Sequence, residues 1–168
     1  MKNLRHHLSG HWVEGTGDPR PLHDPTTEAL VAESRSGGLD LRGALDFARN
    51  TGGPALRALT FAQRGELLLA MSKAIHARRD ELLELARING GNTRGDAKFD
   101  IDGCTGTLAW YGKLGQDLGD RRFQLDSDEP TPLARNPRYV GQHIKVPRHG
   151  VAVHINAFNF PAWGFGEK

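Results

Sequence analysis

An asparagine near the carboxyl end of the sequence has the type and surroundings best suited to chemistry. Asn159 stands in the turn Phe158–Pro161, which follows an apolar, β-branched stretch, Gly150–Ile155, predicted to be a buried strand. Open α/β sheets bind ligands at the carboxyl ends of their strands. An amide there can donate to an oxygen that becomes negative during attack on a carbonyl, which is worth about 3 kcal/mol of barrier. The alternative, an asparagine that only caps the turn, is the more frequent arrangement for these residues alone.

Other groups that could do chemistry fit structural roles better. Cys104 is the only thiol and has no histidine close in sequence to activate it, so we expect it to pack within a helix. Asp96, Asp100 and Asp102 lack the alternating ligands and the final glutamate of a calcium loop. We expect solvated carboxylates near a helix start, where acids are favourable. These patterns predict no metal site.

Two further patterns near Asn159 carry little functional signal. Gly164-Phe-Gly166 has only the opening of a phosphate-binding glycine loop and falls inside an expected helix, so close helix packing explains it better. His154 lies next to the candidate turn, and we expect it to be a hydrogen-bonded structural histidine rather than a base. The histidines are dispersed and lack metal-ligand spacing.

The elements that position Asn159 are predicted to mix short strands and helices. Glycine- and proline-rich turns separate these elements. Strands are expected at Leu8–Trp12, Leu30–Glu33 and Tyr139–Val146, and a surface excursion at 119–138. Helices are expected at Leu39–Asn50 (ended by Gly52-Gly-Pro54), Thr60–Ile88 (begun by the capping box Thr60-Phe-Ala-Gln63), Arg94–Leu118, and from Ala162 onward.

Composition excludes several classes of protein. The 168 residues carry a formal charge of +2 without a basic block, which argues against a nucleic-acid partner. One cysteine rules out an internal disulfide framework and fits a reducing compartment. No apolar run opens or interrupts the sequence, so we expect neither a signal peptide nor a membrane span, and a cytoplasmic location.

Residues 153–161, Val-His-Ile-Asn-Ala-Phe-Asn-Phe-Pro, resemble the Asn-Phe-Pro motif of the aldehyde dehydrogenase superfamily, and Lys168 follows Asn159 by nine positions as in that family. The resemblance is closest to the branch formed by the aldehyde dehydrogenase domains of bifunctional ring-opening enzymes of phenylacetate catabolism. Supporting stretches occur along the chain at Leu8–Trp12, Gly38–Asp40, Gly53–Phe61, Thr93-Arg94, Asp100–Gly103 and Gly106–Leu108.

The resemblance implies an α/β fold of the aldehyde dehydrogenase type. Residues 1–168 would be the amino-terminal part of that domain: an opening hairpin, helices, a bridging strand and the first strand of a Rossmann-like cofactor domain. Asn159 and Lys168 would be catalytic, the lysine through a proton relay. Ile155, Asn156, Ala157, Phe158 and Asn159 would approach the nicotinamide of NADP, with NAD possible. The family's nucleophilic cysteine and its glutamate lie downstream of the motif, beyond Lys168.

Three functions are compatible with this reading. The first is an NADP-dependent dehydrogenase that oxidises a semialdehyde carried on a coenzyme A thioester in phenylacetate breakdown and is fused to a hydratase domain. The second is the stand-alone semialdehyde dehydrogenase of the benzoyl-CoA epoxidation route, and the third a noncatalytic interaction module. The resemblance also implies a homo-oligomer for the full-length protein. The sequence leaves open the acyl chain, the cofactor preference, the oligomer size and the reason the chain ends at Lys168.

Overall fold

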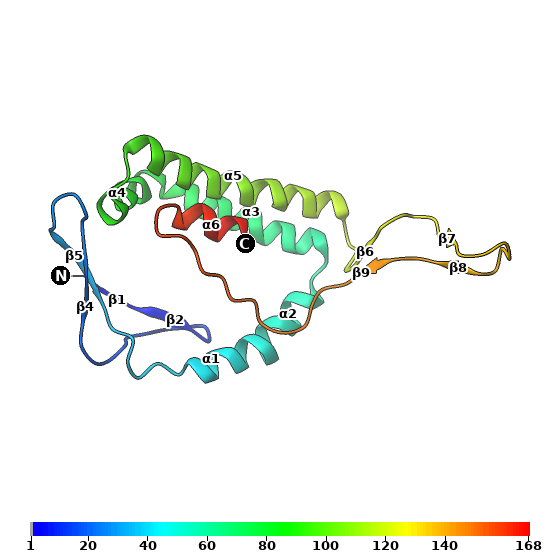
Figure 1. The fold of residues 1–168 in the computed structure, drawn as a ribbon, viewed down its shortest axis with the longest axis horizontal. Helices are drawn as coiled ribbons and strands as arrows, with labels where there is room; N and C mark the ends of the chain where they lie inside the picture. The colour runs from blue at the N-terminus through cyan, green and yellow to red at the C-terminus, as the bar shows by residue number, and fades with distance from the viewer. Residues whose placement is uncertain (1) are drawn as a thin grey trace.

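The computed structural model describes residues 2–168 and has three parts: a group of short strands, a layer of helices and an extended arm (Figure 1). In the first part, β5 (Leu30–Ser34) pairs in parallel with β1 (Lys2–Leu4) and antiparallel with β4 (Arg20–His23). The expected strand at Leu30–Glu33 is therefore confirmed.

A hairpin replaces the single strand expected at Leu8–Trp12. Strands β2 (His6–Leu8) and β3 (His11–Val13) pair antiparallel across a two-residue turn. Ser9 and Gly10 in that turn have φ values of 51° and 86°. Positive φ angles at both central residues give a turn whose twist matches that of the flanking strands. A strand through these two residues was therefore a wrong prediction.

The first helix does not stop at Gly52-Gly-Pro54 as predicted. Helix α1 (Leu41–Phe47) passes into a π-helical turn, η1 (Ala48–Gly52), and then into α2 (Gly53–Ala58), all with right-handed helical dihedrals at the junctions. Pro54 sits at the start of α2, where its missing N–H is least costly. The wider i→i+5 turn before it accommodates the ring, so the helical path continues.

The helix expected from Thr60 to Ile88 is two helices that meet at Arg78. Helix α3 (Phe61–Ala77) begins with the predicted capping box: Thr60 Oγ1 accepts from the Gln63 N–H at 3.2 Å, and Gln63 Oε1 accepts from the Thr60 N–H at 2.9 Å. At Arg78 the backbone N–H donates to the Ile75 carbonyl, a tighter turn that redirects the chain into α4 (Arg79–Gly90). Gly91 ends α4 in the left-handed conformation, with φ of 66°.

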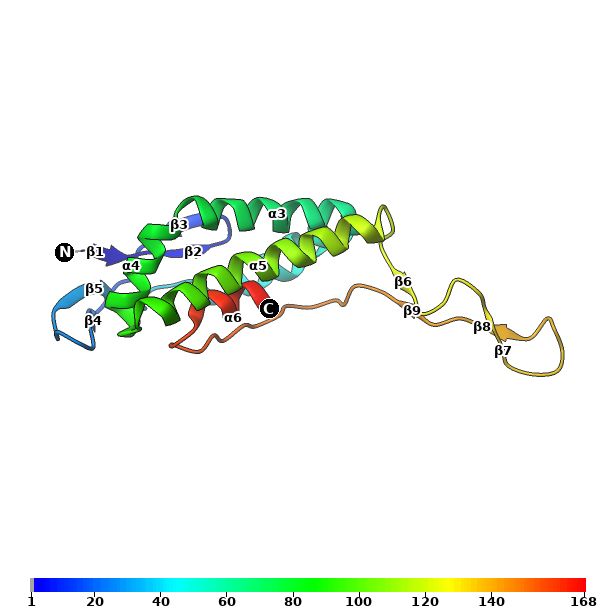
Figure 2. The same cartoon turned by 90° about the horizontal axis from the view of Figure 1, so that it is seen from above.

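Helix α5 (Arg94–Leu118) is the predicted long helix and forms the centre of the fold. It lies along α3 in both ribbon views (Figures 1 and 2). Glycines at the contact let the two backbones approach closely, because a Cβ on Gly65 of α3 would lie 2.4 Å from the Gly112 carbonyl oxygen of α5. The small apolar core gathers Leu83 of α4 with Ala97 and Ile101 of α5.

The surface excursion and the strand predicted after α5 together make a narrow arm that projects from the helices (Figures 1 and 2). Its outgoing half carries β6 (Gln124–Leu125) and β7 (Thr131–Pro132), which pair antiparallel with β9 (Ile144–Lys145) and β8 (Val140–Gly141) of the returning half. The strand expected at Tyr139–Val146 is thus interrupted at residues 142–143.

Residues 151–157 form no strand, contrary to the prediction for Gly150–Ile155. Val153 and Ile155 expose 77% and 85% of their surface. A strand needs a neighbour to accept and donate its backbone hydrogen bonds, and no strand among residues 2–168 pairs with this segment. The chain then enters α6 (Pro161–Glu167), the predicted helix with proline in its first turn, which packs on α5.

Candidate active site

The turn that carries Asn159 lies between the irregular segment 151–157 and helix α6. Residues 158–160 form bends, and Pro161 fixes the backbone at the first position of α6. The Asn159 side chain is exposed, and none of residues 2–168 forms a hydrogen bond with its amide. Its backbone carbonyl accepts from Asn92 Nδ2, at the α4–α5 junction, at 3.2 Å. The backbone is therefore anchored while the side-chain donor faces outward.

A buried carboxylate holds the start of α6. Asp100 of α5 is 0% exposed, and its two oxygens accept from the backbone N–H groups of Ala162 at 3.3 Å and Trp163 at 2.7 Å. These N–H groups belong to the first turn of a helix, where no carbonyl of the same helix can accept from them. Phe160, the residue before α6, provides no side-chain cap, so the cap comes from a different helix.

Aromatic rings form an apolar wall beside the turn. The Phe99 ring of α5 stands edge-to-face with the rings of Phe160 and Trp163, at centroid distances of 6.1 and 4.8 Å. Trp163 also covers Gly103, where an added Cβ would lie 2.7 Å from the indole. The residue after Asn159 in the chain, Phe160, is thus part of an aromatic cluster that joins α5 to the start of α6.

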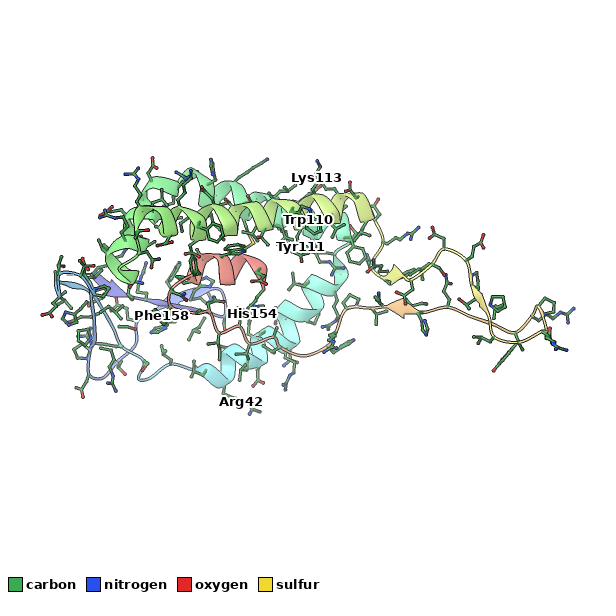
Figure 3. All side chains as sticks on the ribbon, turned by 45° about the horizontal axis from the view of Figure 1, so that its top comes forward. Arg42, Trp110, Tyr111, Lys113, His154 and Phe158 are labelled. Carbon is green, nitrogen blue, oxygen red and sulfur yellow. The ribbon has the colours of Figure 1, made fainter. Side chains whose placement is uncertain are left out.

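The residues expected to approach the nicotinamide lie together on one extended segment. Ile155, Ala157 and Phe158 are exposed, and Figure 3 shows Phe158 and His154 on this segment. Asn156 is different, because its Oδ1 is buried against Gly164 of α6 and has no hydrogen-bond partner. The segment therefore offers exposed apolar side chains, with Asn156 turned into the protein.

His154 is exposed and forms no hydrogen bond within residues 2–168, so the expected structural, hydrogen-bonded histidine is a wrong prediction. The reason is the missing strand, because burial of His154 depended on it.

Cys104 packs inside the helical layer, as predicted. It is 1% exposed and contacts Gly166 of α6, where an added Cβ would lie 2.9 Å from Sγ. Burial raises the pKa of the Cys104 thiol, and the charge of Asp100 raises it further against a smaller effect of the Gly166 N–H. A thiol that is buried and held neutral is a poor nucleophile.

Lys168 lies at the other end of α6 from Asn159. It lines a cavity of about 370 Å³ between α3, α5 and the end of α6. Apolar side chains, Phe61, Leu68 and Leu114, dominate this cavity. Asn159 and Lys168 are thus separated by the length of α6 rather than brought together.

Two of the three carboxylates predicted to be solvated, Asp96, Asp100 and Asp102 of α5, behave differently from that prediction. Asp100 is buried at the start of α6, and Asp102 pairs with Arg79 through two bonds of 2.6 and 2.8 Å. Only Asp96 follows the expectation, since it is exposed in the first turn of α5. Within residues 2–168 no three His, Cys, Asp or Glu side chains gather closely enough to hold a metal ion.

Asp100 is the site residue that the sequence reasoning missed. A signal was present: Ala97, Asp100, Ile101, Cys104 and Leu108 follow one another at spacings of three, one, three and four residues, so Asp100 lies on the apolar stripe of the helix. A carboxylate within such a stripe indicates a buried partner.

Comparison with known proteins identifies the family. Residues 12–168 match the aldehyde dehydrogenase family. The chain is 45% identical over 166 residues to a 3,4-dehydroadipyl-CoA semialdehyde dehydrogenase of Aromatoleum evansii, covering 98% of this chain and 32% of that protein. It is 25% identical over 158 residues to an NADP-dependent succinate-semialdehyde dehydrogenase of Escherichia coli, covering 92% of this chain and 30% of that one.

Solved structures share the fold. A Burkholderia cenocepacia protein assigned to the aldehyde dehydrogenases superposes with a TM-score of 0.76 at 23% identity, covering 97% of this chain and 32% of that one. A point mutant of betaine aldehyde dehydrogenase from Staphylococcus aureus, in complex with NAD⁺, gives a TM-score of 0.60 at 19% identity over 75% of this chain and 25% of that one. The chain spans about a third of the length of the curated relatives it matches.

Proposed function

The chain belongs to the aldehyde dehydrogenase family, and from this premise we propose that it is the amino-terminal part of an NAD(P)-dependent dehydrogenase for a semialdehyde carried on coenzyme A. The observation that carries the proposal is the Asn159 turn: an exposed amide donor on a backbone anchored by Asn92 and by the start of α6. The 45% identity to a CoA-semialdehyde dehydrogenase supports the substrate class.

In the complete enzyme, a cysteine and a glutamate outside these residues would supply the nucleophile and the base. The thiolate adds to the aldehyde carbon and the carbonyl electron pair moves onto oxygen. Asn159 donates its amide N–H to that oxygen, and this bond strengthens as the negative charge develops. As the oxyanion re-forms the carbonyl, the carbon would lose hydride to the bound dinucleotide and become a thioester. Water would then hydrolyse this thioester to the acid and release the cysteine thiol.

The dinucleotide, when bound, supplies the hydride acceptor. Exposed Ile155 and Phe158 fit a planar ring, because both present apolar surface on the segment that leads to Asn159. NADP is the preferred cofactor in our proposal and NAD the alternative. Relatives of both kinds exist, one named for NADP and one structure in complex with NAD⁺.

The aromatic wall is proposed to contact the acyl chain of the substrate. Phe99, Phe160 and Trp163 contact one another at the turn that carries Asn159, and an unsaturated acyl chain would pack well on their rings. The phenylacetate enzyme fused to a hydratase is our first candidate. The name of the 45% identical relative favours a second, a stand-alone enzyme for a dehydroadipyl chain. Comparing the rates for six- and eight-carbon CoA semialdehydes separates the two.

The arm of residues 124–145 is proposed to join subunits of a homo-oligomer. It projects from the helices and exposes Leu133, Tyr139 and Ile144, each by more than half of its surface. Such side chains become buried when a neighbouring subunit covers them.

Asn159→Ala in the full-length protein tests the catalytic proposal. We expect single-turnover hydride transfer to fall by about 100-fold or more, with dinucleotide affinity little changed, because the lost bond acts mainly on the developing charge. Asn50→Ala, at an exposed asparagine of η1, is the matched control and should leave the rate unchanged. An unaltered rate in folded Asn159→Ala would remove this residue from the mechanism. Absence of any aldehyde oxidation by the wild type would favour the noncatalytic interaction module.

A further inference from the structure

We propose that Asp100 is a positioning residue for Asn159: its carboxylate fixes the first turn of α6 and so sets where the Asn159 amide stands. This inference rests on the proposed function of Asn159. It assigns a functional role to a fully buried residue of α5 whose hydrogen bonds go to the backbone of α6.

The contact is built from distant parts of the chain. Asp100 precedes Ala162 and Trp163 by 62 and 63 positions, yet its two oxygens accept from both backbone N–H groups. The carboxylate is 0% exposed, and no Lys, Arg or His among residues 2–168 forms an ion pair with it. The N–H groups at the helix start are thus the polar partners that stabilise this buried group.

Geometry links this contact to the turn. Asn159 is three residues before Ala162, and Pro161 between them restricts the backbone. On the other side, Asn92 Nδ2 holds the Asn159 carbonyl at 3.2 Å. The candidate donor therefore lies between two anchors. Asn92 is at the junction of α4 and α5, and Asp100 is within α5.

Loss of one anchor should displace the Asn159 amide while the helical layer stays folded. Phe158 and Asn159 in the bends at 158–160 are exposed, and Phe160 provides no side-chain cap for α6, so the turn can shift when α6 is released. A misplacement of about 1 Å in a catalytic group can cost about 100-fold in rate. The rest of α5 keeps its contacts with α3, including the bond from Ser72 Oγ to the Thr105 carbonyl at 2.8 Å.

Three variants of the full-length enzyme separate positioning from stability. Asp100→Ala removes both acceptors, and Asp100→Asn retains one amide oxygen of similar shape. Asp102→Ala is the matched control, because it removes a carboxylate two residues away that pairs with Arg79 and does not touch α6. We expect kcat to fall by about 30- to 100-fold in Asp100→Ala, and by less in Asp100→Asn. KM should change little in both, and Asp102→Ala should keep its kcat.

A double-mutant cycle with Asn159→Ala gives the decisive readout. If Asp100 acts through Asn159, Asp100→Ala should have little further effect on the rate once Asn159 is alanine. Equal rate losses from Asp100→Ala in the wild-type and Asn159→Ala backgrounds would overturn the proposal. A full rate in folded Asp100→Ala, equal to that of the control Asp102→Ala, would overturn it as well.

Hydrogen exchange tests the anchor without any activity. Peptides that contain the amides of Ala162 and Trp163 should exchange faster in Asp100→Ala and Asp100→Asn than in the wild type or Asp102→Ala. Unchanged exchange in both Asp100 variants would contradict the anchor itself. A wild-type enzyme that oxidises no aldehyde but shows this exchange pattern would refute the proposed function and leave the anchor standing, so the two failures are distinguishable.

Discussion

At the scale of single residues, burial decides what the one thiol of the chain can do. Cys104 has its Sγ against Gly166, and burial raises the pKa of its thiol. We expect alkylation of the folded chain at pH 7–9 to be much slower than that of a short cysteine peptide, because both access and the thiolate fraction are reduced. Labelling with iodoacetamide before and after adding urea measures this. Rapid labelling of the folded chain would contradict the buried position.

The sequence pointed to Asn159 as a candidate donor, a role that stays a proposal, and did not point to the residue that anchors its turn. Asn159 was identifiable because the turn, the proline and the spacing to Lys168 are local in sequence. The role of Asp100 depends on a contact between residues 62 positions apart, which no local pattern encodes. Only its place on the apolar stripe of α5 gave a sign of burial.

At the scale of elements, the contact between α3 and α5 depends on glycine. A Cβ at Gly65 would lie 2.4 Å from the Gly112 carbonyl oxygen, whereas a Cβ at Gly106 of α5 would meet nothing within 4 Å. We therefore expect Gly65→Ala to lower the free energy of unfolding by about 1–3 kcal/mol. Gly106→Ala should raise it by about 0.5–1 kcal/mol, because alanine loses less backbone entropy in a helix. Urea denaturation of both variants measures the two changes, and changes of the same sign would refute the close-packing explanation.

The pair between α4 and α5 should make stability depend on acid pH. The hydrogen bonds from Arg79 hold the pKa of Asp102 below its ordinary value of 3.8. A lowered folded-state pKa means that the pair stabilises the chain above about pH 4 and that this contribution disappears as pH falls through the folded-state pKa. Because Asp102 is partly exposed, we expect less than about 1 kcal/mol.

Urea denaturation from pH 7 down to pH 2 tests that dependence. The difference in unfolding free energy between the wild type and Asp102→Asn should be largest at neutral pH and shrink below pH 4. Asp120→Asn, at an exposed carboxylate, serves as control and should differ little from the wild type throughout. A constant difference for Asp102→Asn across the whole range would show that the ion pair does not stabilise the fold.

Element boundaries were predictable where a local cap exists. The capping box at Thr60 marked the real start of α3. The break at Arg78 was missed because the apolar spacing continues through it. The change of chain direction at Arg78 lets α4 pack on α5, a contact that the local sequence does not indicate. The expected stop at Pro54 failed because a π turn precedes the proline.

At the scale of the whole molecule, the predicted fold class is confirmed by the family match and by the structure that superposes over 97% of the chain. What the sequence could not predict is the state of residues 151–157. Their β-branched pattern describes a buried strand, but a strand also depends on neighbours, and Val153 and Ile155 are exposed here. The side-chain pattern thus indicates a preference for a strand, and the strand forms only where a neighbouring strand provides its backbone hydrogen bonds.

That exposed segment and the buried thiol together predict that residues 1–168 alone oxidise no aldehyde and bind dinucleotides weakly. Hydride transfer in the proposed mechanism requires a covalent adduct, and the only cysteine is enclosed between α5 and α6. Ile155 and Phe158 offer apolar contacts to a ring, but no described strand orders their segment. Calorimetry with NADP and NAD, and a search for NAD(P)H formation with a CoA semialdehyde, measure both. Micromolar binding, or turnover abolished by Cys104→Ala, would show that these residues form a working site by themselves.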